Sequence, residues 1–289
     1  MKTYYELWEG KVPFFEEKFQ TRDNQNASTI TPYLLADGDP HPCMVIVPGG
    51  GYRHRAEHEG DDTAVWLNAM GISAFVVNYR VHPYEPVAMI ADIKRAMRLV
   101  RYNAQQYNID PERIGIMGFS AGAHLACYMS EFFEDNEYLP DGKIDKTSAR
   151  PDLCVLCYPV ITFEYKKLLL ERDIKIFEKS LGVFNNMTRI SCEKNVNRRM
   201  PPVFMWHTFE DTRVPVIHSI KMAEALRKKG VEFEYHIFTN GKHGLSIRRV
   251  ANTEGTNQWP MLLRNWLFRH NFKVEMKPQK VEIKSQKKV

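Results

Sequence analysis

The residues best suited to chemistry surround a serine that follows a short apolar run. Ile114 to Met117 reads as a buried strand, and Gly118-Phe119-Ser120-Ala121-Gly122 then gives the pattern G-x-S-x-G. In this pattern a strand ends, the chain turns sharply and a helix begins at once, which lifts the serine hydroxyl above the sheet edge. The pattern also occurs by chance in loops, but residues 121–133 have the apolar spacing of the required helix. Ser120 is therefore a candidate nucleophile.

An acidic residue and a histidine stand just past two later strand-like runs. Glu210 and Asp211 follow the run 203–207, and His243 follows the run 232–238. A serine hydroxyl is a weak nucleophile that needs a base within reach, and an acid to hold that base in the right tautomer. Each residue alone would read as part of a solvated loop, but together they predict Ser120 as nucleophile, His243 as general base and then acid, and Asp211 as orienting acid.

A run of three glycines follows another predicted strand. Residues 43–47 form a short apolar run that stops at Pro48-Gly49-Gly50-Gly51. A flexible hairpin is one interpretation, but the run also suits a loop whose backbone N–H groups point at a ligand. With the N–H of Ala121 at the start of the helix, Gly50 and Gly51 would form an oxyanion hole.

Buried strands alternate with amphipathic helices along the chain, which predicts an α/β fold with a mostly parallel sheet covered by helices on both faces. The expected strands are 28–35 (an edge strand), 43–47, 72–78, 114–117, 153–160, 203–207 and 232–238. The expected helices are 61 or 62 to 70, 86–107, 121–133, 163–181, 216–229 and 258–270. We expect a single domain over 1–272, with 161–200 as a candidate cap-like insertion.

Composition excludes several classes of protein. The 289 residues are 44% hydrophobic, with no span for a bilayer and no visible signal peptide. Five cysteines argue against a disulfide framework and favour a reducing, cytoplasmic location. Cys154 and Cys157, three apart in an apolar run, are expected on opposite faces of a core strand. Of the net charge of +5, a basic flexible tail over 273–289 carries +4, so no nucleic-acid partner is expected.

The chain resembles α/β-hydrolase serine esterases of the group that contains acetylxylan esterases and feruloyl-esterase-like enzymes. The resemblance rests on segments spread over most of the chain: 47–52, 110–124, 191–196, 201–215 and 241–246. The order Ser, Asp, His along the chain is that of the α/β-hydrolases. The resemblance implies the α/β-hydrolase fold, no cofactor and no metal, and hydrolysis of small or oligosaccharide esters such as acetylated xylan.

The resemblance also bears on individual residues. In the resembled esterases the acid lies four residues before a proline, and Asp211 holds that place relative to Pro215. Tyr52, Phe119 and Pro159 are candidate substrate-binding residues. Two positions depart from the pattern, since Pro48 stands where a histidine is common and Ala123 where a second glycine is common.

Two histidine features allow other interpretations. His54 to His58 matches the zinc-peptidase pattern H-x-x-E-H, which needs both histidines on one helix face and a third ligand. The segment follows the triple glycine and ends at Gly60, so a helix is not expected there and both histidines are expected to rim a pocket. His124, one turn into the helix after Ser120, is expected to be a buried core histidine.

Other functions remain open from the sequence. A general small-ester carboxylesterase is the nearest alternative. A peptidase of the prolyl-oligopeptidase kind would normally bring a large extra domain, and a glycosidase would need two facing carboxylates. A catalytically silent binding protein would be expected to lack a member of the triad. The oligomeric state is not predicted.

Overall fold

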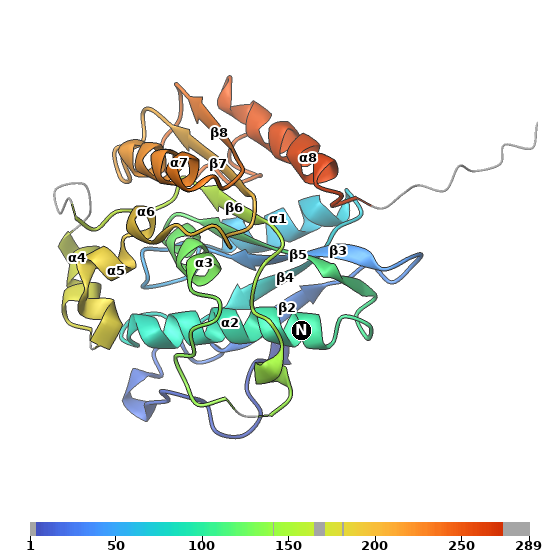
Figure 1. Cartoon of the computed structure of the whole chain (residues 1–289), viewed down its shortest axis with the longest axis vertical. Coiled ribbons are helices and arrows are strands. Elements are labelled where there is room, and N and C mark those ends of the chain that lie inside the picture. The colour runs from blue at the N-terminus through green and yellow to red at the C-terminus, as the bar shows by residue number, and fades with distance from the viewer. Residues whose placement is uncertain (1–3, 141, 165–170, 181, 274–289) are drawn as a thin grey trace, which may run out of the picture.

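The computed structural model describes residues 4–140, 142–164, 171–180 and 182–273. Its centre is an eight-stranded sheet in the order β1-β2-β4-β3-β5-β6-β7-β8 (Figure 1). The strands are β1 Tyr5–Glu6, β2 Thr29–Tyr33, β3 His41–Val47, β4 Ser73–Asn78, β5 Ile109–Phe119, β6 Cys154–Cys157, β7 Val203–Thr208 and β8 Phe233–Phe238. The strands β4, β3 and β5 to β8 run parallel, whereas β1 and β2 pair antiparallel at one edge. The fold is that of the α/β-hydrolases, as expected.

Helices cover both faces of the sheet (Figure 1). They are α1 Glu57–Asn68, α2 Pro86–Tyr102, α3 Ala121–Glu131, α4 Glu171–Glu178, α5 Met187–Ile190, α6 Cys192–Asn195, α7 Ile217–Lys229 and α8 Trp259–Arg269. One core cluster joins the sheet to α2, α3 and α7, and a second joins it to α1 and α8. Each parallel strand is therefore buried on both faces, which explains the near-continuous apolar runs in the sequence.

The strand β6 confirms the prediction for the two cysteines. Cys154 lies in the first core cluster and Cys157 in the second, on opposite faces of the sheet. All five cysteines of the chain are buried and free. The C-x-x-C pair therefore belongs to a core strand and not to a redox motif.

The start of α1 is a correction. The sequence predicts a helix capped by Asp61 or Asp62, but α1 begins at Glu57 with Ala56 as its N-cap. Gly60 was interpreted as a helix breaker, whereas it lies inside α1, where a Cβ atom would come within 2.9 Å of a Val76 methyl group. The glycine permits close packing of helix on strand and does not end the helix.

Several other elements differ from the prediction. The strand β5 begins at Ile109 instead of Ile114, and β6 ends at Cys157 instead of Val160. The strand over 28–35 is not an edge strand, because β1 pairs with its outer side. The helix predicted to reach Tyr107 ends at Tyr102. The helix predicted over 163–181 is wrong at its start, because Phe163 and Glu164 are not helical and the Phe163 N–H donates to the Ser191 hydroxyl. The described helix α4 covers Glu171–Glu178. Residues 274–289 of the predicted tail lie outside the described residues.

Candidate active site

Ser120 lies in the sharp turn between β5 and α3. Its backbone has φ 52° and ψ −119°, a left-handed conformation that is unusual for a residue with a side chain. The flanking glycines make the turn possible, because a Cβ atom at Gly118 would lie 2.5 Å from the Ala123 Cα. At Gly122 a Cβ atom would lie 2.2 Å from the Val47 carbonyl oxygen. The G-x-S-x-G pattern is therefore a steric requirement of this turn, which holds the serine at the sheet edge.

The structure brings Ser120, His243 and Asp211 into one hydrogen-bonded chain. The Ser120 hydroxyl lies 2.7 Å from His243 Nε2, and His243 Nδ1 lies 2.6 Å from Asp211 Oδ2. The three residues follow β5, β8 and β7, which are parallel strands whose carboxyl ends meet at one edge of the sheet. The geometry lets Nδ1–H donate to the carboxylate while Nε2 accepts the serine proton.

Asp211 sits in a pocket of hydrogen-bond donors. Its Oδ1 atom accepts the backbone N–H groups of Arg213 and Val214, each at 3.0 Å. The buried His207 lies 3.3 Å from its Oδ2 atom through Nε2. Burial alone would raise the pKa of the Asp211 carboxyl, but the bonds from His207, His243 and the Val214 N–H outweigh it and hold the pKa well below its usual range. The Asp211 carboxylate therefore stays ionised whether the His243 ring is neutral or protonated.

The neighbouring acid points elsewhere. The Glu210 carboxylate accepts the backbone N–H of Gly241 at 2.8 Å, in the loop that carries His243. Residues 209–210 form a turn after β7, and the two adjacent acids reach different partners, the loop backbone and the imidazole. Glu210 thus shapes the histidine loop without contacting the ring.

The triple-glycine loop lies directly against the serine. A Cβ atom at Gly49 would lie 2.6 Å from the Phe119 carbonyl oxygen and 3.0 Å from Ser120 Cβ. Gly50 and Gly51 have φ of 127° and 60°, conformations that favour glycine. Within the described part of the chain, the N–H groups of Gly50, Gly51 and Ala121 make no hydrogen bond to other residues. They are free to face an oxyanion beside the serine.

A buried carboxylate that sequence reasoning missed holds this loop. Glu59, in α1, accepts the N–H of Gly49 at 2.7 Å through Oε2 and the hydroxyl of Tyr158 at 2.7 Å through Oε1. The Tyr79 hydroxyl donates to the Pro48 carbonyl oxygen at 2.7 Å. Glu59 and Tyr79 thus anchor the loop although Pro48 replaces the histidine common in the resembled esterases. Glu59 lies one residue after the H-x-x-E-H pattern, whose own glutamate is Glu57, so that pattern did not single it out.

The three candidate substrate-binding residues are all buried beside the site. Tyr52 and Phe119 are 1% and 0% exposed, and Pro159 is buried as well. The Tyr52 hydroxyl lies 3.0 Å from His124 Nδ1, so its polar end is already engaged. Their role in substrate binding stays a prediction, and their burial favours shaping the site over offering a polar contact.

His124 is the core histidine that the sequence predicts. It is 1% exposed, and its Nε2 lies 2.8 Å from the Ile190 carbonyl oxygen. Burial lowers its pKa to about 4, and the bond to Ile190 only partly opposes this. The ring is therefore neutral at pH 7, with Nε2–H donating to Ile190 and Nδ1 accepting from Tyr52. It links α3 to the segment between β6 and β7.

The H-x-x-E-H segment is split by the start of α1. His58 lies in the helix and His54 precedes it, so the two do not share a helix face. A Cβ atom at Gly244 would lie 4.0 Å from His58 Nε2, which places His58 beside the histidine loop. Burial and the nearby Arg249 lower the pKa of His58. A group of residues that could hold a metal ion lies elsewhere, at Cys127, Glu131 and Cys192.

Part of the insertion between β6 and β7 lies over the glycine loop. Asp173 Oδ1 would be 3.5 Å from a Cβ atom on Gly51, and the Phe177 ring meets the Tyr52 ring edge-on at 5.0 Å. Both residues belong to α4. These α4 residues therefore form a wall beside the triple-glycine loop. Among the described residues no helix is long and apolar enough to cross a bilayer.

Comparisons with known proteins show which family the chain belongs to. The BD-FAE family matches residues 33–226, more than half of the chain. The chain is 37% identical over 231 residues to endo-1,4-beta-xylanase B of Butyrivibrio fibrisolvens, covering 78% of this chain and 35% of that protein. It is 31% identical over 223 residues to an acetylxylan esterase of Xylanibacter ruminicola, covering 74% and 43%. The chain thus spans less than half the length of these two curated relatives.

Solved structures extend the comparison to almost the whole chain. An acetyl ester-xyloside bifunctional hydrolase from Caldicellulosiruptor lactoaceticus superposes with a TM-score of 0.86 at 40% identity, covering 94% of this chain and 98% of that one. The carboxylesterase Cest-2923 from Lactobacillus plantarum superposes with a TM-score of 0.74 at 23% identity, covering 86% and 94%, which bears on the fold alone. The chain belongs to the BD-FAE family and has the α/β-hydrolase fold.

Proposed function

We propose that this protein is a serine carboxylesterase that removes short acyl groups, acetyl above all, from carbohydrate esters such as acetylated xylan or xylo-oligosaccharides. The observation that supports it most strongly is the hydrogen-bonded chain from Ser120 through His243 to Asp211, with a glycine loop against the serine. The similarity to an acetylxylan esterase and to an acetyl ester-xyloside hydrolase supports the substrate class.

The first half of the reaction builds an acyl-enzyme. His243 Nε2 takes the proton of the Ser120 hydroxyl as the oxygen attacks the ester carbonyl, and the ionised Asp211 stabilises the resulting imidazolium. His243 then gives the proton to the sugar oxygen, which leaves as an alcohol. In the second half, water attacks the acyl carbon and His243 accepts its proton; His243 then gives that proton to the Ser120 oxygen as it leaves, which releases the free acid and restores the enzyme.

Negative charge on the carbonyl oxygen needs fixed donors. The N–H groups of Gly50, Gly51 and Ala121 have no partner among the described residues, and the adjoining Gly49 packs against Ser120, so they are the proposed donors. Losing one such donor typically costs about 10²- to 10³-fold in kcat. Glu59 and Tyr79 preorganise this loop through Gly49 and Pro48.

The α4 wall supports a preference for short acyl chains. Asp173 and Phe177 sit over Gly51 and Tyr52, so the space above the oxyanion donors is bounded by the insertion. We propose that 161–200 acts as a cap that limits the acyl group and leaves the sugar side open.

Glycoside hydrolysis has less support, although two relatives carry xylanase or xyloside in their names. That chemistry needs an acid and a second carboxylate facing the sugar bond. The carboxylates nearest the serine are engaged, since both oxygens of Glu59 and both of Asp211 accept hydrogen bonds within the protein. A general carboxylesterase without sugar preference is the alternative to be separated by experiment.

A substrate panel tests the proposal. We expect kcat/KM for p-nitrophenyl acetate to exceed that for butyrate, and both to exceed octanoate, with release of acetate from acetylated xylo-oligosaccharides at comparable efficiency. No p-nitrophenyl xyloside hydrolysis is expected. Octanoate ranking first would overturn the short-acyl assignment, and activity on the nitrophenyl esters without acetate release from sugars would favour the general carboxylesterase.

A further inference from the structure

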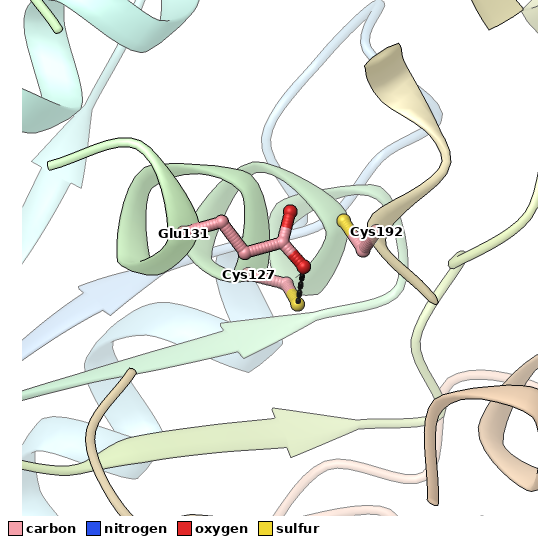
Figure 2. A group of neighbouring side chains, drawn as sticks. All are labelled: Cys127, Glu131 and Cys192. Atoms are coloured by element: carbon pink, nitrogen blue, oxygen red, sulfur yellow. Dashed lines mark hydrogen bonds between the residues drawn. The ribbon is translucent and has the colours of Figure 1, made fainter. Parts of the chain in front are cut away.

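Two cysteines and a glutamate meet beside α3, the helix that begins directly after Ser120. Cys127 and Glu131 are four residues apart on α3 and so share one helix face. Cys192, the first residue of α6, faces them, and Figure 2 shows the Glu131 carboxylate pointing toward the two sulfurs. The two sulfurs and a carboxylate oxygen all lie within 4.8 Å of one another. The site is separate from the triad.

The carboxylate in this cluster is buried without a compensating charge. Glu131 is 2% exposed, and both cysteines are 0% exposed. Its Oε1 atom accepts from the weak Cys127 S–H donor at 3.8 Å, and its Oε2 atom has no hydrogen-bond partner among the described residues by distance and angle. Within the described ranges no lysine, arginine or histidine forms an ion pair with Glu131. A carboxyl group in this position is costly unless it is neutral or meets a cation.

Burial favours the protonated form of each group in the cluster. It raises the pKa of Glu131 well above its usual range; the nearby Cys127, Glu193 and Cys154 raise it further, and a hydrogen bond with Cys192 opposes them. Burial likewise raises the pKa values of the Cys127 and Cys192 thiols. A divalent cation reverses this balance, because a coordinated thiol loses its proton outright.

We propose that Cys127, Cys192 and Glu131 bind one thiophilic divalent cation of the zinc and cadmium class. Two thiolates and one carboxylate are a recognised ligand set for such an ion, with metal–sulfur distances of about 2.3 Å. Ligands at those distances lie roughly 3.5 to 4 Å apart, so the side chains close in modestly on the ion.

Binding exchanges protons for the ion. One cation replaces the protons of two thiols and one carboxylic acid, so three protons leave and the site passes from neutral to a single negative charge. The bonds formed are two metal–sulfur and one metal–oxygen bond. No oxidation is involved.

The ion would link the segment between β6 and β7 to helix α3. Cys192 belongs to the segment between β6 and β7, while Cys127 and Glu131 belong to α3, which begins directly after Ser120. His124 already joins the same two segments through the Ile190 carbonyl. An ion bound only by the folded chain adds stability by mass action and takes no part in the ester chemistry.

Metal content of the whole protein tests the site. We expect about one zinc per chain in protein made in zinc-supplemented cells and purified without chelator. Cys127→Ser and Cys192→Ser are each expected to lose at least about tenfold of that content, since even an indirect supporting residue is typically worth that much. Cys43→Ser is the matched control, because Cys43 is also buried and free but lies in β3, outside the cluster.

Cadmium supplies a readout that is specific for sulfur ligands. Wild-type protein refolded with Cd²⁺ is expected to gain a thiolate-to-cadmium charge-transfer absorption, and Glu131→Gln to keep that absorption with affinity at least about tenfold weaker. Folded wild type that holds no metal and shows no such absorption would overturn the site. Equal metal content in wild type and in the folded cysteine variants would overturn it too. If the serine variants fail to fold, the wild-type absorption and Glu131→Gln still decide.

Discussion

The carboxylate of Glu59 accepts the N–H of Gly49 at 2.7 Å and the hydroxyl of Tyr158 at 2.7 Å. The Tyr158 ring meets the His243 ring edge-on at 5.0 Å. Glu59 therefore holds both the triple-glycine loop and the tyrosine that packs against the proposed base. Burial raises the pKa of Glu59, opposed by these two hydrogen bonds. The residue acts through its neighbours and is a positioning residue.

Replacing Glu59 by glutamine should lower kcat by about 10²-fold with KM little changed. The amide keeps the volume but offers only one acceptor oxygen, so either Gly49 or Tyr158 loses its partner, and small displacements near reacting atoms cost about that much. The measurement is steady-state kinetics on p-nitrophenyl acetate, after circular dichroism confirms folding. Glu57→Gln, an exposed position on the same helix, is the control and should match wild type. A Glu59→Gln enzyme with wild-type kcat would remove the positioning role.

Asp211→Asn should lower kcat by about 10⁴-fold, as in the trypsin case from which this magnitude is taken. The asparagine no longer holds His243 in the tautomer with its proton on Nδ1, while the fold stays intact. Glu210→Gln is the matched neighbour and should cost about tenfold or less, because its carboxylate reaches the Gly241 N–H and not the imidazole. The test is the kcat of both variants. A large loss for Glu210→Gln with little loss for Asp211→Asn would show that Glu210 is the orienting acid.

His124 should make stability depend on pH between about 4 and about 6.5. Its pKa is lowered to about 4 in the folded chain, whereas an unfolded histidine titrates near 6.5. Between these values the unfolded chain binds a proton that the folded chain does not, so the stabilisation is present above about 6.5 and is lost as the pH falls toward about 4. The slope is at most about 1.4 kcal/mol per pH unit.

Urea unfolding of wild type and His124→Gln across that range provides the test. The difference in unfolding free energy between the two proteins should shift in favour of His124→Gln as the pH falls. Other buried carboxyl groups titrate equally in both proteins and cancel in the difference. A difference that is constant from pH 4 to 7 would contradict the buried neutral histidine.

Esterase activity should survive exhaustive chelation. The proposed reaction uses Ser120, His243 and Asp211 alone, and the Cys127 cluster lies outside that hydrogen-bonded chain. The assay compares kcat before and after prolonged dialysis against a chelator, with thermal stability followed in parallel. Activity that disappears with intact fold and returns with zinc would point instead to His54 and His58.

The triad residues and the glycine loop could be predicted from sequence because each needs its residue type. Gly118 and Gly122 have no room for a side chain, and Ser120 occupies a left-handed turn that only this pattern allows. Asp211 and His243 follow parallel strands, whose shared edge brings them together without further information.

Glu59 could not be assigned because its role depends on contacts distant in sequence. The hydroxyl of Tyr158 comes 99 positions later, and no local pattern links it to α1. The start of α1 was missed for a related reason, since Gly60 looks like a helix breaker until Val76 is placed against it. Phe163 likewise lies outside the described helices, and its N–H donates to the Ser191 hydroxyl 28 positions later. Tertiary contacts decided each case, and local propensity did not.

Trapping the acyl-enzyme tests the central claim most directly. Wild-type protein mixed with p-nitrophenyl acetate should release a burst of about one nitrophenol per chain. Acid quenching and peptide mass spectrometry should then locate the acetyl group on Ser120. Ser120→Ala should show neither the burst nor the adduct while keeping the wild-type fold. An acetyl group found on another residue, or steady hydrolysis by folded Ser120→Ala at the wild-type rate, would contradict the account.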